Sequence, residues 1–183
     1  MAKRITLAVV VLVLVAFPVA LGADHNPKFI VGSGLLAYGE EVSPPEVVRC
    51  LGGEPTGLTF PYGLPCSEGT HRIIARNEVQ IWFPLSVSDD AAKLLNGEIT
   101  LTVNCNFNAQ YRGPCWGTFT WEVPEVGTWE GHWTTPVQDL GTYESVMNMV
   151  GFGEGGEIDG KQIKLDGYSD PGDYYVTFTA RIK

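Results

Sequence analysis

Apolar and polar residues alternate over most of the chain beyond residue 28. Successive side chains of a β-strand point to opposite faces, so this alternation predicts strands that each bury one face. The alternating runs are short, rich in β-branched and aromatic residues, and separated by turn-forming residues. The predicted strands cover residues 28–40, 70–87, 97–110, 115–123, 127–135, 143–154, 160–168 and 173–183.

One segment, SVSDDAAKLLNGE, departs from this alternation and predicts a short helix. Ser88 has a side chain suited to the N-cap, and Asp89 and Asp90 suit the positive end of the helix dipole. Gly97 suits the position where the helix stops.

The stretch WGTFTWEVPEVGTWEGHWTT predicts a hairpin in which residues 124–126 form the loop between two aromatic strands. This loop length pairs Trp121 with Trp129, and it places Phe119 and Trp133 on the same face as that pair. A slip of one residue would send the two aromatic sets to opposite faces, so the pattern favours this register. Four tryptophans are then available to line a barrel interior and bind a ligand: Trp116, Trp121, Trp129 and Trp133.

Glu130 and His132 fall on the other face of this hairpin and are the candidate catalytic residues. If the aromatic side chains fill the barrel, these two residues lie on the solvated surface. If the aromatic face instead packs outward, the carboxylate and the imidazole line the lumen, where they can act as acid and base. The surface interpretation is favoured.

The first 22 residues have the three parts of a secretory signal peptide, namely a basic start, an apolar run and small residues before a cleavage point. Cleavage is expected after Gly22, and an uncleaved membrane anchor is the alternative. Residues 23–183 then form one domain that is secreted or periplasmic. The formal net charge of −9 gives no attraction to nucleic acid or anionic lipid.

Four cysteines in an exported chain favour two disulfides. Residues 41–69 hold five prolines and five glycines and predict a long loop, with Cys50 and Cys66 near its two ends. Cys105 and Cys115 lie symmetrically in a predicted hairpin, where opposed side chains are close enough for a bridge. The predicted pairs are therefore Cys50–Cys66 and Cys105–Cys115, and a long-range pairing is the alternative.

No cofactor or metal is expected from the sequence. The spacing of the cysteines and histidines matches no zinc motif. The run GFGEGG (151–156) has the letters of a dinucleotide-binding loop, but a strand-like segment follows it where that loop requires a helix. These glycines are expected to allow a bend or bulge in a strand.

Consecutive hairpins without an internal repeat favour an up-and-down barrel, with an immunoglobulin-like sandwich as the second choice. Four stretches, PCSEGTHRIIAR, GEITLTVNCNFNAQYRGPCWGTFTWEV, GTWEGHWTT and GFGEGGEIDGKQIKLDGY, resemble exported bacterial β-proteins related to the allene oxide cyclase and dirigent type of barrel. The resemblance covers roughly residues 70–183. It implies an all-β, calycin-like antiparallel barrel of about eight strands with a central cavity, often in oligomers, and carries over no catalytic residue.

Three functions are consistent with these features. The first is an exported barrel that binds a small hydrophobic or aromatic ligand. The second is a solid barrel that acts as an envelope or extracellular interaction module, through an apolar surface or an oligomer contact. The third is a cyclase or isomerase acting on an apolar substrate, so the sequence leaves open whether the protein is an enzyme. A homo-oligomer is compatible with each of them, and no nucleic acid or membrane partner is expected after signal cleavage.

Overall fold

The computed structural model describes residues 29–57, 65–139, 142, 144–169 and 175–183. The predicted signal peptide, residues 1–22, lies outside this part of the chain. Two short helical segments occur, α1 (Asp89–Leu95) and the 3-10 turn η1 (Gly156–Ile158). The strands are β1 (Ile30–Ser43), β2 (Val47–Leu51), β3 (Arg72–Val87), β4 (Glu98–Asn108), β5 (Arg112–Val123), β6 (Gly127–Asp139), β7 (Ser145–Glu154), β8 (Gln162–Ser169) and β9 (Tyr175–Ile182).

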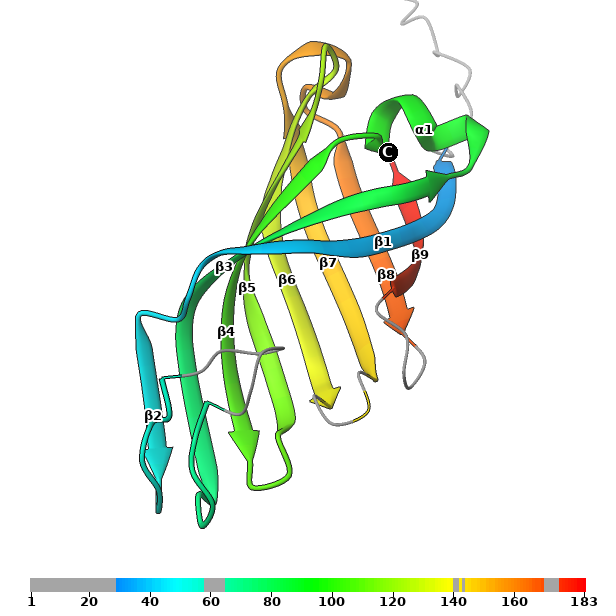
Figure 1. The fold of residues 1–183 in the computed structure, drawn as a ribbon. Helices are drawn as coiled ribbons and strands as arrows, with labels where there is room; N and C mark the ends of the chain where they lie inside the picture. Colours follow the sequence, from blue (N-terminus) through cyan, green and yellow to red (C-terminus); the bar gives the residue numbers. More distant parts are fainter. Residues whose placement is uncertain (1–28, 58–64, 140–141, 143, 170–174) are drawn as a thin grey trace, which may run out of the picture.

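Eight of these strands close into an antiparallel barrel (Figure 1). Neighbouring strands follow the order β1-β9-β8-β7-β6-β5-β4-β3, and β3 pairs back with β1. From β3 to β9, strands consecutive in the sequence are also neighbours in the barrel. This up-and-down connection confirms the predicted small antiparallel barrel with one short helix.

The segment 41–69, predicted as one long loop, is partly β-structure, and that prediction was wrong in this respect. β1 continues to Ser43, and β2 pairs with residues 72–76 of β3. The two prolines at positions 44 and 45 separate these strands, and the β-branched Val47 and Val48 that follow suit a strand. The high proline and glycine content of residues 41–69 as a whole concealed this short strand. Residues 58–64 of the segment lie outside the described residues.

Both predicted disulfides are confirmed. Cys50 of β2 is bonded to Cys66, and this bridge ties β2 to the chain that leads into β3. Cys105 and Cys115 are directly opposed in β4 and β5, and their Cα atoms are 4.2 Å apart. The second bridge therefore links neighbouring strands across the hairpin, as the symmetry of the sequence around it predicts.

The predicted register of the β5–β6 hairpin is also confirmed, because Trp121 pairs with Trp129. Both side chains are 0% exposed, and Phe178 of β9 packs edge-on against Trp121 with ring centroids 6.5 Å apart. An internal space large enough for water would leave its lining atoms accessible. These aromatic side chains therefore fill the barrel around them at the density of a protein core.

Glycines in the barrel wall make room for these large side chains. A Cβ atom at Gly151 would lie 2.6 Å from Cζ of Phe119, and one at Gly131 would lie 2.9 Å from Cε1 of the same ring. Gly131 and Gly151 are directly opposed in β6 and β7, so Phe119 lies against a patch of bare backbone. The glycine run 151–156 ends β7 and forms the turn into η1, in place of the strand-to-helix loop that a dinucleotide needs.

Helix α1 covers one end of the barrel. Its Leu94 and Leu95 are 0% exposed, and the indole N–H of Trp129 donates a hydrogen bond of 2.9 Å to the Leu94 carbonyl. Ser88 is at the N-cap position, as predicted, but its side chain makes no capping bond to the helix. Its Oγ instead accepts a 3.1 Å hydrogen bond from the backbone N–H of Ser33, which ties the start of the helix to β1.

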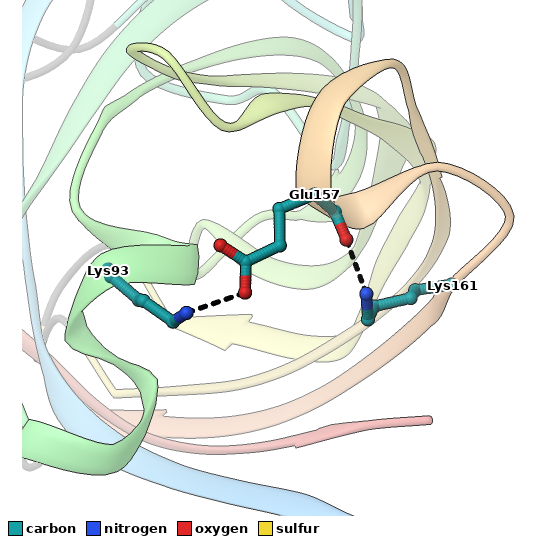
Figure 2. Close-up of polar contacts among 3 residues, drawn as sticks. All are labelled: Lys93, Glu157 and Lys161. Carbon is teal, nitrogen blue, oxygen red and sulfur yellow. Dashed lines mark hydrogen bonds and ion pairs between the residues drawn. The ribbon is translucent and has the colours of Figure 1, made fainter.

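An ion pair joins this helix to the turn after β7 (Figure 2). The Nζ atom of Lys93 lies 2.5 Å from Oε1 of Glu157, and Lys161 donates to the backbone carbonyl of Glu157. The hydrogen bond from Lys93 lowers the pKa of Glu157 below its ordinary value. Both side chains of the pair are well exposed, so the buried leucines, and not this pair, provide most of the attachment of α1.

The packing of Phe119 gives a prediction about Gly151. The substitution Gly151→Ala is expected to lower the free energy of unfolding by about 1–3 kcal/mol, because the added methyl group overlaps Phe119 and the Glu130 carbonyl. The change Glu154→Ala, at an exposed residue of the same strand, should cost about 0.5 kcal/mol or less. Denaturant unfolding measures both values, and a Gly151→Ala protein as stable as the wild type would contradict this packing.

Candidate functional site

The structure places three of the four predicted ligand-binding tryptophans inside the barrel. Trp121, Trp129 and Trp133 are at most 4% exposed. Trp116 was wrongly predicted to line the interior, because it pairs with Thr134 on the outer face of the sheet. The guanidinium of Arg76 lies over its ring, 5.0 Å from the centroid. Trp116 thus stacks against a cation on the outside of the barrel.

Glu130 and His132 lie on the outer face of β6, and both are exposed. Their partners on β5 are Thr120 and Thr118, which share this outer face. The acid–base hypothesis for these two residues required them in the lumen, and the aromatic face of the hairpin fills the interior instead. A cluster of partly exposed, inward-facing polar groups comes from a different part of the chain, namely β3 and β1.

The inner face of β3 carries polar residues that the hydrophobic pattern did not predict. Glu78 is directly opposed to Val103 of β4, Gln80 to Leu101, and Trp82 to Ile99. These three β4 residues are 6%, 2% and 1% exposed and belong to the barrel core. Directly opposed residues of an antiparallel pair share a face, so three residues of β3 point into the barrel: Glu78, Gln80 and Trp82.

Two residues of β1 join them from the other side of β3. Tyr38 is opposed to Trp82, and Glu41 is opposed to Gln80. The Tyr38 and Trp82 rings meet edge-to-face, with centroids 5.7 Å apart and an interplanar angle of 82°. The described pairing of β1 with β9 ends at Ala37, so this part of β1 lies beyond that pairing, in a region that we call the rim. We call Tyr38, Glu41, Glu78, Gln80 and Trp82 the inner polar cluster.

Two consecutive hydrogen bonds link Trp82 to Gln80 and Gln80 to Glu78. The indole N–H of Trp82 donates to Oε1 of Gln80 at 3.0 Å, and Nε2 of Gln80 donates to Oε1 of Glu78 at 2.5 Å. Gln80 thereby holds the Glu78 carboxyl group in a fixed position, and Trp82 fixes the orientation of the Gln80 amide. All five residues are partly exposed, unlike the apolar core beside them.

Burial raises the pKa of Glu78 above its ordinary value. The hydrogen bond from Gln80 opposes this shift by stabilising the carboxylate, and the nearby negative charge of Glu41 adds to it. Oε2 of Glu41 is buried and accepts no hydrogen bond from the residues that the structure describes. Among the described residues, no lysine, arginine or histidine forms an ion pair with either carboxyl group. The cluster therefore presents unneutralised acceptors to any molecule at the rim.

A β-bulge in β3 explains why sequence analysis missed the cluster. In an unbroken strand, the inward residues after Ala75 would be Asn77 and then Val79, Ile81 and Phe83, and the last three are apolar as a core requires. The register between β3 and β4 shifts between Ala75 and Glu78, so the alternate set faces inward. The only sequence signal is the polar run Arg-Asn-Glu, whose asparagine tolerates the left-handed backbone that a bulge can require.

Comparisons with family models, curated proteins and solved structures found no match to this chain. In the described part of the chain, α1 is short, and no helix there has the length and apolar character of a membrane span. A surface depression at the β5–β6 turn is lined by residues 122–128 and Gly156, and it includes none of the inner polar cluster.

The raised pKa of Glu78 predicts how stability depends on pH. A carboxyl group whose folded-state pKa is raised destabilises the folded protein when it is charged, and this cost develops as pH rises from the ordinary value of 4.5 through the raised value. Glu78→Gln keeps an acceptor for Gln80 and removes the charge. The variant should melt at a higher temperature than the wild type at pH 7, with a difference that shrinks towards zero below pH 4.5.

Thermal melts from acidic to neutral pH test this expectation. Glu130→Gln is the matched control, because Glu130 is exposed on the outer face and its replacement should give no such pH-dependent gain. A Glu78→Gln variant that is less stable than the wild type at neutral pH, with the deficit disappearing in acid, would show that the charged carboxylate stabilises the fold.

Proposed function

We propose that the protein is an exported β-barrel that binds a small aromatic or hydrophobic ligand at its rim, against the inner polar cluster. The observation that carries this proposal is the contrast within one barrel. The side chains of Trp121 and Trp129 are 0% exposed, whereas the residues of the cluster face inward and stay partly exposed. A ligand bound at the rim would cover this partly exposed surface.

The chemistry of the cluster favours one class of ligand. The edge-to-face pair of Tyr38 and Trp82 offers aromatic surface for the apolar body of a ligand. Glu41 and Glu78 offer carboxyl oxygens and lack a cationic partner among the described residues. An aromatic or alkyl amine satisfies both features, because its ammonium group pairs with carboxylates and interacts favourably with aromatic rings.

The two disulfides support the exported location that this proposal includes. The two disulfides are of the kind that persist outside the cytosol, and they agree with the predicted signal peptide. The resemblance to the allene oxide cyclase and dirigent type of barrel stays a prediction, and a ligand site at the barrel rim is consistent with it. The cyclase hypothesis loses its proposed acid and base, since Glu130 and His132 lie outside.

Two probes of similar size and opposite charge test the proposal. At pH 7 phenethylamine is a cation and 3-phenylpropionate is an anion. The wild-type protein is expected to bind the amine, and Glu78→Gln should weaken this binding by about tenfold, which corresponds to about 1.4 kcal/mol. Glu130→Gln should leave it unchanged, because that carboxylate lies on the outer face. Isothermal titration calorimetry measures all of these affinities.

Two binding results would contradict the proposal. Equal or tighter binding of 3-phenylpropionate would contradict an acceptor-rich site, because the two carboxyl groups repel an anion. Failure of both probes to bind, at millimolar concentration, would move the function from the rim to the outer surface of the barrel.

The outer surface has one feature that favours a second function, that of an interaction module. Val146, Val150 and Phe152 alternate along the outer face of β7 and are 41%, 42% and 59% exposed. Tyr168 of β8 lies directly opposite Val146 and extends this apolar stripe. Exposed apolar side chains that gather on one face are typical of contacts with another protein chain.

Sedimentation velocity tests this second function with the chain itself as the partner. If the stripe holds identical chains together, the wild type should sediment as an oligomer, and Phe152→Ser should shift it towards the monomer. Phe83→Ser, at an exposed phenylalanine of β3, should leave the oligomer unchanged. A monomeric wild type, or equal effects of the two substitutions, would remove the stripe as a self-association surface.

A further inference from the structure

The β-bulge in β3 is held by its own set of contacts. Ala75 is opposed to Cys105 and Glu78 to Val103, so two residues, Arg76 and Asn77, lie opposite the single residue between those partners. Asn77 has a φ of 58°, in the left-handed region that asparagine tolerates better than most residues. The extra residue reverses which side chains of the following segment face the barrel interior.

Arg76 clamps the bulge from the outer face. Its guanidinium donates 2.7 Å hydrogen bonds to the carbonyls of Ala75 and Cys105 and a 2.8 Å bond to Oδ1 of Asn106. The same group lies over the ring of Trp116. These contacts reach three strands, β3, β4 and β5. A planar guanidinium makes such a divided set of bonds in a way that a single ammonium group does not.

Asn104 of β4 fills the position opposite the two extra residues. Its Oδ1 accepts a 3.2 Å hydrogen bond from the backbone N–H of Asn77, and its Nδ2 donates to the Trp116 carbonyl at 3.3 Å. The Asn77 side chain donates to Oε2 of Glu46 at 2.7 Å. The backbone N–H that the bulge removes from the ladder is thus satisfied by a side chain.

We propose that Arg76 and Asn77 are positioning residues for the ligand site, because the bulge they form turns Glu78, Gln80 and Trp82 into the barrel. This inference rests on the proposed function for its biological meaning. The alternation of side chains along a strand also defines how β3 would be arranged without the bulge. Without the bulge, the inward residues would be Asn77, Val79, Ile81 and Phe83, and the rim would be mostly apolar, with no carboxyl group from β3.

The alternative would turn Val79, Ile81 and Phe83 inward and move the Glu78 carboxyl group out to water, at the cost of turning Trp82 outward. The contacts of Arg76 and Asn77 favour the bulged arrangement over it. A segment that keeps a polar face inward against the hydrophobic pattern is expected where the polar face has a use. Arg76 acts on the cluster through the backbone of β3, because its hydrogen bonds go to Ala75, Cys105 and Asn106. These bonds hold the bulge, which sets the direction in which the cluster side chains point.

Two substitutions of Asn77 separate the effect of its left-handed backbone conformation from the effect of its side-chain hydrogen bond. Both remove the hydrogen bond to Glu46. Glycine adopts the left-handed conformation readily, whereas β-branched valine strongly disfavours it. Asn77→Gly is expected to keep the bulge, the raised pKa of Glu78 and an affinity for phenethylamine within about twofold of the wild type. Asn77→Val is expected to return the pKa of Glu78 to the ordinary range and to weaken phenethylamine binding by about tenfold or more.

The pKa of Glu78 is read from the carboxyl ¹³C chemical shift across a pH titration, and circular dichroism confirms that each variant is folded. If Asn77→Val does not fold while Asn77→Gly does, the requirement for a left-handed residue is supported, and Arg76→Ala then provides the titration. Arg72→Ala is its control, because Arg72 is an exposed residue of the same strand. The titration of Glu78 is expected to change in Arg76→Ala and to stay as in the wild type in Arg72→Ala.

A folded Asn77→Val protein in which Glu78 still titrates as in the wild type would overturn the proposal. So would an Asn77→Gly protein in which the raised pKa is lost, or a folded Arg76→Ala protein in which it is retained. The titration does not depend on any ligand. If it changes as expected and the wild type does not bind phenethylamine, the positioning role stands and the proposed function fails.

Discussion

The direction in which Glu78, Gln80 and Trp82 point depends on the two extra residues of β3. Side chains of a strand alternate between its faces, so one bulge decides the face of every residue that follows until the next irregularity. Arg76 holds this bulge with hydrogen bonds to Ala75, Cys105 and Asn106. The partly exposed polar surface at the barrel rim is a consequence of that clamp.

The rest of the barrel provides the stability that such a rim requires. A buried carboxyl group with a raised pKa and an unpartnered oxygen on its neighbour both oppose folding. Aromatic side chains packed against wall glycines, the leucines of α1 and two disulfides favour it. The protein thus combines a closed, solid region beside α1 with an open polar region at the rim, and only the second has the exposure that a binding site needs.

Local patterns predicted much of this fold, because their consequences are local. The β5–β6 register follows from aromatic alternation, and the disulfides follow from hairpin symmetry and loop closure. The inner polar cluster depends on contacts between Arg76 and residues about thirty positions away, which no alternation records. Trp116 was misplaced although alternation along the strand already puts it on the face opposite Phe119 and Trp121. What the sequence does not record is its cationic partner, Arg76 of β3.

The most direct test of this account is a set of nuclear Overhauser effects from the methyl groups of Val103. Val103 belongs to the buried face of β4 and is directly opposed to Glu78. The account predicts strong effects from these methyl groups to side-chain protons of Glu78 and weaker ones to Gln80. Strong effects to the side-chain protons of Asn77 and to the methyl groups of Val79 instead would show that β3 runs without the bulge, and the polar rim would not exist.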